Sequence, residues 1–412
     1  MADGVLTRAD PPSGARESWR GLPISLRIGI LYLLCRVVTS VFFLVAAELS
    51  GPTSRFGAKP SIGDFAIGWD AQWYWYVAVN GYPSELPLTE AGQVAENQWA
   101  FMPVYAYLAQ VLGLPFHSWG AAAVLISLIA GYFACLVLYR LLRLRLDEVA
   151  ATWAVLFFAS APLAALFQIG YAESLFLLLL FLSLNAVMRR KYGWLYLLLP
   201  LMGYTRPGVL AFALLLGLHG IQRWLARARD PLPRRHVAHI VALGALAVAV
   251  GFSWQAVAAV ATGDPSAYLE TELAWRRNWL PQPVAHFVPL EGFIEAAAFW
   301  FQSWGLGAVT GKIALALAVA AVAALLVFDR RVRALGPEIR LWSASYLVYL
   351  LLVFFPQSSV FRLLVPLSPL WGAAAVPRSL SWRLSVLGAC LLGQWWWIYN
   401  MYALGNTYWQ IP

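Results

Sequence analysis

Charged residues are scarce in this chain. They make up 12% of its 412 residues and hydrophobic residues 61%, whereas about a quarter of the residues in soluble domains are charged. A fold surrounded by water cannot absorb so much apolar surface. In hydrocarbon, only helices and closed barrels satisfy their own backbone hydrogen bonds, and the apolar runs here are long and continuous rather than alternating. The sequence therefore predicts an all-α polytopic membrane protein.

Cysteine is also scarce. The three cysteines, Cys35, Cys135 and Cys390, all lie in apolar runs, which excludes a disulfide framework and a cysteine metal site. The closest histidine pair, His236 and His239, has only Asp230 as a nearby carboxylate, so no metal site is expected there. No cofactor is required by any spacing. Acidic residues in the first loop described below could still hold a divalent ion, and metal dependence stays open.

The net charge of +9 does not indicate nucleic-acid binding. Basic residues lie in short clusters between apolar runs instead of forming one face with interleaved aromatics. Such clusters are typical of cytoplasmic loops. We therefore expect a cytoplasmic tail over residues 1–27 and, since no cleavage site follows a short apolar stretch, a retained first transmembrane helix from Ile28 to Leu49.

The remaining apolar runs predict about eleven crossings in one transmembrane domain, residues 28–404. Two polar, aromatic segments, residues 50–100 and 263–295, are expected as outer loops, and residues 405–412 as an extracytoplasmic tail. The run from Phe101 to Leu114 is too short to cross a core about 30 Å thick, so we expect it to be re-entrant or interfacial. The expected later spans include residues 121–138, 149–167, 174–188, 237–260, 306–328, 341–355, 363–376 and 384–402, with two shorter ones on either side of residues 205–208.

The first loop contains the most informative stretch, residues 68–82. As a helix it aligns Trp69, Trp73, Tyr76 and Asn80 on one side, the pattern of an interfacial helix, and Gly81 would end it. Asp70 would stand at the start of this helix, close to the membrane surface. Two interpretations remain open: Asp70 caps the helix, or it meets the hydroxyl of a substrate.

The same stretch, Trp69-Asp70-Ala71-x-Trp73-Tyr74 with Gly81-Tyr82, resembles the class V phosphatidylinositol-glycan mannosyltransferases and their bacterial relatives, in the GT-C superfamily of multi-span glycosyltransferases. Further matches follow in the family's order: Phe101-Met102-Pro103-Val104-Tyr105, Tyr171-Ala172-Glu173-Ser174-Leu175-Phe176, Thr205-Arg206-Pro207-Gly208 and Phe361-Arg362-Leu363-Leu364-Val365-Pro366. Met102, Ala106 and Ala172 depart from the family's pattern, which puts the substrate in doubt.

This resemblance implies a GT-C type bundle in the bacterial plasma membrane that moves mannose from a polyprenyl-phosphate donor to a lipid or glycan acceptor. The active site would be extracytoplasmic and the reaction inverting. A phosphate leaving group needs no proton, so one general base and nearby cations suffice. Asp70 is the expected base and Asp64 its competitor. Arg206 and Arg362 are expected at the lipid phosphate, and the other expected substrate-binding residues are Trp69, Tyr74, Tyr82, Tyr171 and Glu173.

Alternatives stay open for several of these residues. Arg206 and Arg362 could snorkel to the headgroups, and Glu173 could serve structural pairing. Arg36, inside the first span, is expected to snorkel or to pair within the bundle and is left out of the site. Two other functions also remain: a transporter or flippase for a lipid-linked substrate, and a GT-C enzyme that uses another sugar.

Overall fold

The computed structural model describes residues 21–277, 287–407 and 410–412. Over these ranges the chain is helical, and its one β pairing is an isolated bridge between Leu88 and Val94. The prediction of an all-α protein is therefore confirmed. Four helices are long and apolar enough to cross a bilayer: α2 (Ile24–Leu49), α6 (Trp119–Leu142), α11 (Arg234–Thr262) and α14 (Ala308–Phe328). The chain is a membrane protein, whereas its eleven crossings stay a prediction.

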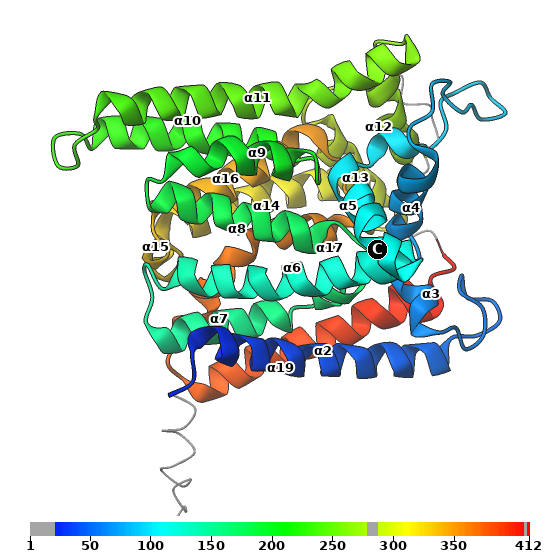
Figure 1. Cartoon of the computed structure of the whole chain (residues 1–412), viewed down its shortest axis with the longest axis horizontal. Coiled ribbons are helices and arrows are strands. Elements are labelled where there is room, and N and C mark those ends of the chain that lie inside the picture. Colours follow the sequence, from blue (N-terminus) through cyan, green and yellow to red (C-terminus); the bar gives the residue numbers. More distant parts are fainter. Residues whose placement is uncertain (1–20, 278–286, 408–409) are drawn as a thin grey trace, which may run out of the picture.

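Shorter helices run beside these four and complete the bundle (Figure 1). They are α7 (Glu148–Ala159), α8 (Glu173–Met188), α9 (Leu195–Gly203), α10 (Val209–Leu225), α16 (Pro337–Val353) and α19 (Leu380–Ile398). Between them lie short elements: η3 (Ala164–Gln168), η4 (Tyr192–Trp194), α17 (Val360–Leu363), η5 (Val365–Leu370), α18 (Trp371–Ala375) and a π-helix, η6 (Tyr399–Leu404).

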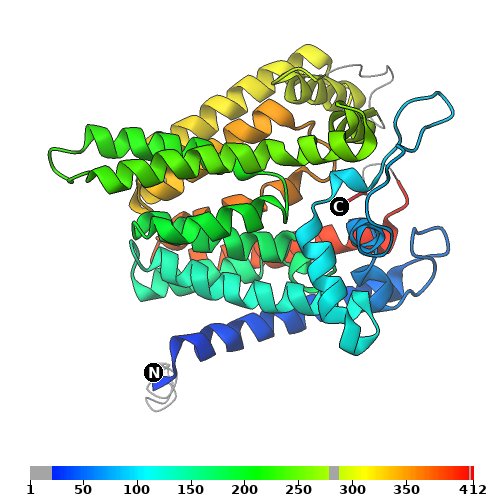
Figure 2. The same cartoon turned by 45° about the horizontal axis from the view of Figure 1, so that its top comes forward.

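One end of the bundle carries the two loops predicted to be outer. It holds α3 (Ile62–Ala66), α4 (Asp70–Asn80), η1 (Gln98–Ala100), α5 (Pro103–Gly113), η2 (Leu114–Phe116), α12 (Ala267–Arg277) and α13 (Glu291–Ser303). Figures 1 and 2 both place α3, α4 and α5 at this end. The short run predicted to be re-entrant or interfacial forms α5, an 11-residue helix with Pro103 in its first turn. The second loop continues through residues 278–286, which lie outside the described part of the chain.

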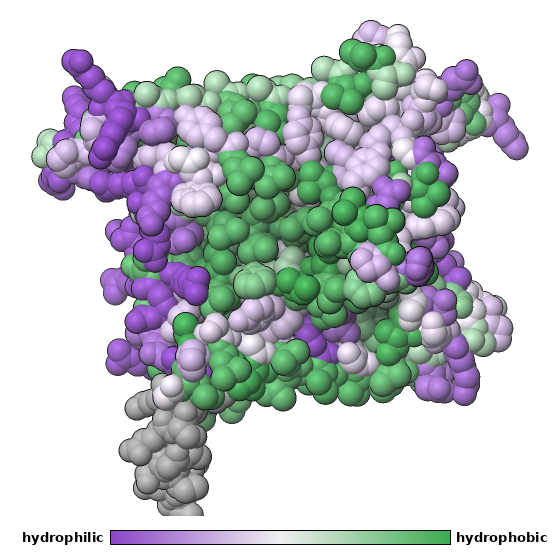
Figure 3. Space-filling model, in the orientation of Figure 1, coloured by the Kyte–Doolittle hydropathy of each residue, from purple (hydrophilic) through white to green (hydrophobic). Residues whose placement is uncertain are grey.

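Basic clusters gather at the opposite end, where α15 (Arg330–Ala334) also lies (Figures 1 and 3). Ion pairs join their elements there: Arg27 with Glu148 at 2.6 Å, Arg145 with Glu338 at 3.4 Å and Arg190 with Asp230 at 2.5 Å. The clusters predicted to be cytoplasmic thus share one face, and Figure 3 shows a broad apolar surface between the two hydrophilic ends. Arg8, Arg16 and Arg20, on which the tail prediction also rested, lie outside the described residues.

The span expected over residues 149–167 is wrong as a continuous helix. α7 ends at Ala159, and Ser160 to Leu163 separate it from η3. Pro162 explains the break, because proline cannot donate to the preceding turn. Arg36 donates to the carbonyls of Ala159 and Ala164 across this break. Arg36 therefore pairs within the bundle, one of the two expected outcomes.

The span expected over residues 363–376 is also broken, into α17, η5 and α18. Pro366 cannot donate to the carbonyl of Arg362, four residues earlier. Two aromatics of α16 donate to carbonyls that the broken helix leaves free: Trp342 to Pro366 at 2.9 Å and Tyr346 to Leu363 at 2.8 Å. Irregular backbone at membrane depth is tolerated where protein surrounds it in this way.

Candidate functional site

Four charged side chains meet at the end of the bundle that carries the two loops. Arg362 is paired with Asp70, Arg206 is paired with Glu173, and Arg362 Nη1 also lies 3.4 Å from Glu173 Oε1. Glu173 thus contacts both arginines. The side chains of Glu173 and Arg362 are 3% and 11% exposed, whereas that of Asp70 is 21% exposed. The cluster has no net charge, and Asp70 is the carboxylate open to an incoming molecule.

Asp70 is held by the start of α4. The helix spans Asp70–Asn80 and stops at Gly81, whose φ of 70° suits a residue without a side chain, so the predicted helix and its end are confirmed. Trp69, just before it, adopts a φ of 53°, a conformation that costs a non-glycine residue roughly 1–3 kcal/mol. Its indole donates to the carbonyl of Met401 at 3.0 Å, and the Arg55 guanidinium lies 4.1 Å from a ring centroid of Trp69. These contacts hold the strained turn that directs Asp70.

Glu173 begins α8, where the helix dipole favours an acidic residue. Gly170 brings this helix start against the first loop: its N–H donates to the carbonyl of Ala66 at 2.7 Å. A Cβ at this position would lie 3.1 Å from the Cβ of Ala71, so a larger residue would push α4 away. The small residue at position 170 therefore sets the distance between Glu173 and Asp70.

Both site arginines lie at interruptions in helices. Arg206 lies between α9 and α10, just before Pro207 and Gly208, and Arg362 lies in the four-residue α17. Sequence analysis predicted both of them at the lipid phosphate. The structure brings them together through Glu173, although 156 residues separate them in the chain.

The predicted aromatic residues fall into two groups. Tyr171 is at the cluster: the Arg362 guanidinium carbon lies 5.3 Å from its ring centroid, and its hydroxyl accepts from the Asp70 N–H at 3.4 Å. Tyr74 is buried against Phe101 and Tyr105, with ring centroids 5.2 Å apart in both pairs. Tyr74 therefore packs α4 onto α5 and supports the site from behind.

Tyr82 lies in a separate aromatic cluster. Its hydroxyl donates to the carbonyl of Phe101 at 2.8 Å, and its ring stacks on Trp99 with centroids 4.6 Å apart. The hydroxyl is thus already engaged, as is the indole N–H of Trp69. In the described structure these two residues shape the first loop, and their predicted contact with a substrate stays untested.

Asp64 has a local structural partner. It forms a capping box with Ser61 at the start of α3, in which each side chain bonds the other residue's backbone N–H. The Asp64 carboxylate is therefore occupied by capping, whereas that of Asp70 faces a guanidinium from the other end of the chain. This contrast favours Asp70 over its competitor.

An apolar groove of about 670 Å³ is lined in part by residues that flank Arg362 in the chain. Phe361 and Leu364, on either side of Arg362 in the chain, line it together with Pro162 from the break after α7 and Trp396 from α19. The groove thus runs between the two broken helices and α19. Its position places apolar surface next to the cation Arg362.

The second loop covers the first. Asn97 donates to the hydroxyl of Thr271 at 2.8 Å, and the ring centroids of Trp73 and Trp275 lie 5.6 Å apart. Sequence reasoning missed Glu272 in this cover. Burial raises the pKa of its carboxyl to about 7, although a hydrogen bond from Tyr268 opposes the shift. The i, i+4 spacing of Tyr268 and Glu272 was the available signal.

No group of three metal-ligating side chains occurs within the described ranges. Asp70 and Glu173 each face arginine, and the acid–arginine pairs leave the metal dependence of the site an open question.

No protein-family model matches the chain, and no curated protein matches it. Among solved structures, the chain is similar to an oligosaccharyltransferase of Archaeoglobus fulgidus in complex with zinc and sulfate, with 14% identity, a TM-score of 0.43, and coverage of 89% of this chain and 52% of that one. It is similar to ArnT from Cupriavidus metallidurans bound to undecaprenyl phosphate, with 16% identity, a TM-score of 0.46 and coverage of 88% and 62%.

A third similar structure is the oligosaccharyltransferase AglB from Archaeoglobus fulgidus with an inhibitory peptide and a dolichol-phosphate. Here the identity is 15%, the TM-score 0.44, and the coverage 91% of this chain and 56% of that one. The chain thus spans a little over half of these proteins' length. Similarity at this level assigns neither family nor activity, so the functional argument rests on the residues of this chain.

Proposed function

We propose that this protein is a GT-C glycosyltransferase that moves mannose from a polyprenyl-phosphate donor to a hydroxyl of a lipid or glycan acceptor. The observation that carries the proposal is the cluster of Asp70, Glu173, Arg206 and Arg362 at one end of an apolar bundle. Displacement of a phosphate requires a general base and cations that stabilise the leaving group, and the cluster offers one partly exposed carboxylate beside two arginines. The ordered motif matches to the class V mannosyltransferases support the same reaction.

In the proposed reaction, the acceptor oxygen attacks the anomeric carbon while Asp70 takes the hydroxyl proton. The bond between that carbon and the phosphate oxygen breaks, and the electron pair leaves with the polyprenyl phosphate. Attack from the face opposite the phosphate inverts the configuration. The leaving phosphate needs no proton because guanidinium groups stabilise its charge.

The observed pairing explains how the donor would prepare the base. In the structure, Arg362 is paired with Asp70. A phosphate is a stronger bidentate partner for a guanidinium than one carboxylate oxygen, so donor binding would draw Arg362 away and free Asp70. Glu173 would keep Arg206 beside Arg362 during this exchange because it contacts both. Glu173 is then a positioning residue.

The apolar groove beside Arg362 suits the donor's lipid. A polyprenyl chain needs continuous apolar contact that starts at its phosphate, and Phe361 and Leu364 provide such contact next to the cation. Clusters of basic residues at the opposite face favour a cytoplasmic location for that face. The site would then be extracytoplasmic, at the surface of a bacterial plasma membrane.

The decisive experiment is a transfer assay with the purified full-length protein. Polyprenyl-phosphate mannose with a labelled sugar would be incubated with a membrane lipid extract, and labelled products would be separated from the donor. We expect transfer by the native protein and a loss of about 10²–10⁴-fold for Asp70→Asn, the usual contribution of a general base. Asp64→Asn is the matched control, since its carboxylate caps α3, and should keep the transfer rate of the native protein.

Two outcomes would overturn the proposal. Full transfer by Asp70→Asn would remove the assigned base. Movement of the labelled donor across vesicle membranes without any new glycosidic bond would favour a transporter or flippase instead. Separate assays with polyprenyl-phosphate donors that carry glucose or a pentose identify the sugar. Transfer from one of these donors, with none from the mannose donor, would correct the proposed specificity.

A further inference from the structure

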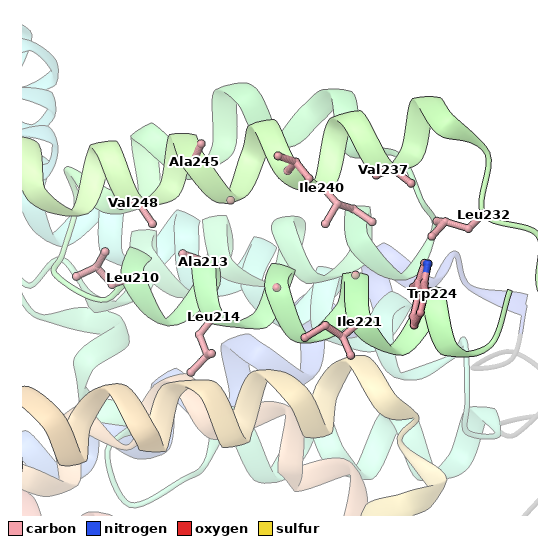
Figure 4. Close-up of a pocket in the computed structure, with 14 residues that line it drawn as sticks. Leu210, Ala213, Leu214, Ile221, Trp224, Leu232, Val237, Ile240, Ala245 and Val248 are labelled. Atoms are coloured by element: carbon pink, nitrogen blue, oxygen red, sulfur yellow. The ribbon is translucent and has the colours of Figure 1, made fainter.

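A second apolar groove runs lengthwise between α10 and α11. It has a volume of about 740 Å³ and is lined from Leu210 to Trp224 on α10 and from Leu232 to Val248 along the loop and α11. Figure 4 shows Trp224 and Leu232 at one end of the groove and Leu210 and Val248 at the other. Along α10 this corresponds to about 21 Å, more than half of the roughly 30 Å core of a bilayer.

The groove is hollow because small residues line its floor. Gly217 and Gly244 line the groove, and a Cβ added at either position would meet no atom within 4 Å. Large side chains form its rim and remain exposed: Ile221, Trp224 and Val241 are each more than half exposed. An apolar hollow of this shape on the membrane-facing surface accommodates a hydrocarbon chain.

The end of the groove at Trp224 and Leu232, its mouth, is strongly basic. The loop between the helices and the first turn of α11 carry Arg227, Arg229, Arg234 and Arg235, all exposed. The one acidic residue of this loop, Asp230, is already paired with Arg190 at 2.5 Å and lies 3.7 Å from Arg223. Within the described residues, the four exposed arginines have no carboxylate partner.

One of these arginines, Arg227, contacts a residue that lines the groove. The Arg227 guanidinium carbon lies 4.0 Å from a ring centroid of Trp224, the residue that closes the basic end of the groove, and Arg227 donates to the Trp224 carbonyl at 2.8 Å. α11 also begins here, and the positive end of its dipole adds to the local field. An occupant with a negative head and an apolar tail matches both halves of this surface.

We propose that this groove binds an anionic phospholipid of the leaflet at the basic face, with its phosphate among Arg227, Arg234 and Arg235 and one acyl chain between α10 and α11. A free phosphate ion would satisfy the arginines but would leave the groove empty, so the assignment commits to the lipid. Basic surfaces between membrane helices on the cytoplasmic side are suited to such headgroups. This site is independent of the proposed glycosyl transfer, and its test does not depend on activity.

The test is native mass spectrometry of the full-length protein titrated with phosphatidylglycerol or, separately, with phosphatidylcholine of the same acyl chains. We expect at least one phosphatidylglycerol to be retained with about tenfold preference, because the exposed arginines attract an anionic headgroup and not a zwitterionic one. The double variant Arg234→Gln/Arg235→Gln should lose this preference. The matched control is Arg330→Gln/Arg333→Gln, an equally exposed pair on α15 that does not line the groove, and it should retain the preference.

A groove-filling variant separates a bound lipid from adsorbed headgroups. Gly244→Leu places a side chain in the open groove without a clash, and Gly388→Leu, on α19, is a control with equally open space. We expect about tenfold weaker phosphatidylglycerol binding for Gly244→Leu and none of this loss for Gly388→Leu. Equal binding of the two lipids, unchanged binding in Gly244→Leu, or full competition by inorganic phosphate would each overturn the proposal. If Gly244→Leu fails to fold, the arginine variants decide.

Discussion

Two buried arginines of this protein lie beside broken helices, and their partners differ. Arg36 donates to the carbonyl of Ala159, which the break after α7 leaves without a helical donor, and to that of Ala164, the first residue of η3. Arg362 faces the carboxylates of Asp70 and Glu173. A cation that bonds carbonyls of its own bundle satisfies backbone hydrogen bonds and has no anionic partner that a substrate anion could replace. A cation that bonds carboxylates can exchange one anion for another, and this difference is the reason why we propose Arg362, and not Arg36, as a residue of the site.

Removal of Arg362 gives the largest expected effect on the transfer rate. Arg362→Gln should lower the rate of glycosyl transfer by about 10²–10³-fold, the usual cost of one lost donor to a developing oxyanion. Stability in detergent should change little by comparison, since Asp70 is partly exposed and can turn to water. Rates from the transfer assay, together with thermal unfolding, measure both quantities.

Arg362→Lys is the companion variant. Lysine keeps the charge but cannot bind a phosphate bidentately, so partial recovery is expected. An Arg362→Gln protein that unfolds readily but transfers at the native rate would erase the contrast with Arg36.

Removal of Arg36 should instead lower stability and leave the transfer rate unchanged. Arg36→Leu removes two hydrogen bonds and leaves the Ala159 carbonyl without a donor, and relief from burying the guanidinium offsets part of the cost, so we expect about 2–3 kcal/mol less stability. The folded fraction should transfer sugar at the native rate. Unfolding by a denaturing detergent measures the first quantity. Leu34→Ala, at a lipid-exposed position of the same helix, is the control and should unfold like the native protein. A native-like unfolding curve for Arg36→Leu would refute its structural role.

The smallest expected effect concerns the acid that covers the site. Burial raises the pKa of Glu272 to about 7, above the value of about 4.5 for an exposed glutamate. The folded state therefore binds a proton that the unfolded state has lost, and stability should fall as the pH rises through this window. We expect about 1–2 kcal/mol between pH 5 and 8, after allowance for screening by water.

Thermal unfolding across this pH range, for the native protein and Glu272→Gln, tests the assignment. The variant should lose most of the pH dependence, and Glu270→Gln, two residues earlier on the same helix, should keep it. A pH dependence that persists unchanged in Glu272→Gln would assign the effect to another group.

Hydropathy and turn residues were sufficient to predict the long helices. The first helix begins four residues before its predicted start and ends at Leu49 as predicted, and α4 matches its aromatic periodicity with Gly81 as its end. The breaks in the spans at 149–167 and 363–376 were missed because their residues stay apolar. Hydropathy measures side-chain transfer, and it does not register that Pro162 or Pro366 interrupts the backbone ladder.

The candidate site could be predicted only as separate residues. Motifs singled out Asp70, Glu173, Arg206 and Arg362, but their pairing depends on packing between segments up to 292 residues apart. Periodicity along one helix carries no information on such contacts. Glu272 escaped notice for a related reason: Glu270 lies on the same helix and is paired with Arg277, and the sequence does not show which of the two acids is desolvated.

The neutrality of the four-residue cluster has a consequence for the proposed reaction. When a proton moves from the acceptor to Asp70, one unit of negative charge disappears there, and the departing phosphate gains one unit. Arg362, drawn from Asp70 to the donor phosphate, would lie beside the group that gains this charge. The sum over the whole assembly stays constant from donor to product, and the surrounding hydrocarbon never has to accommodate a change in total charge.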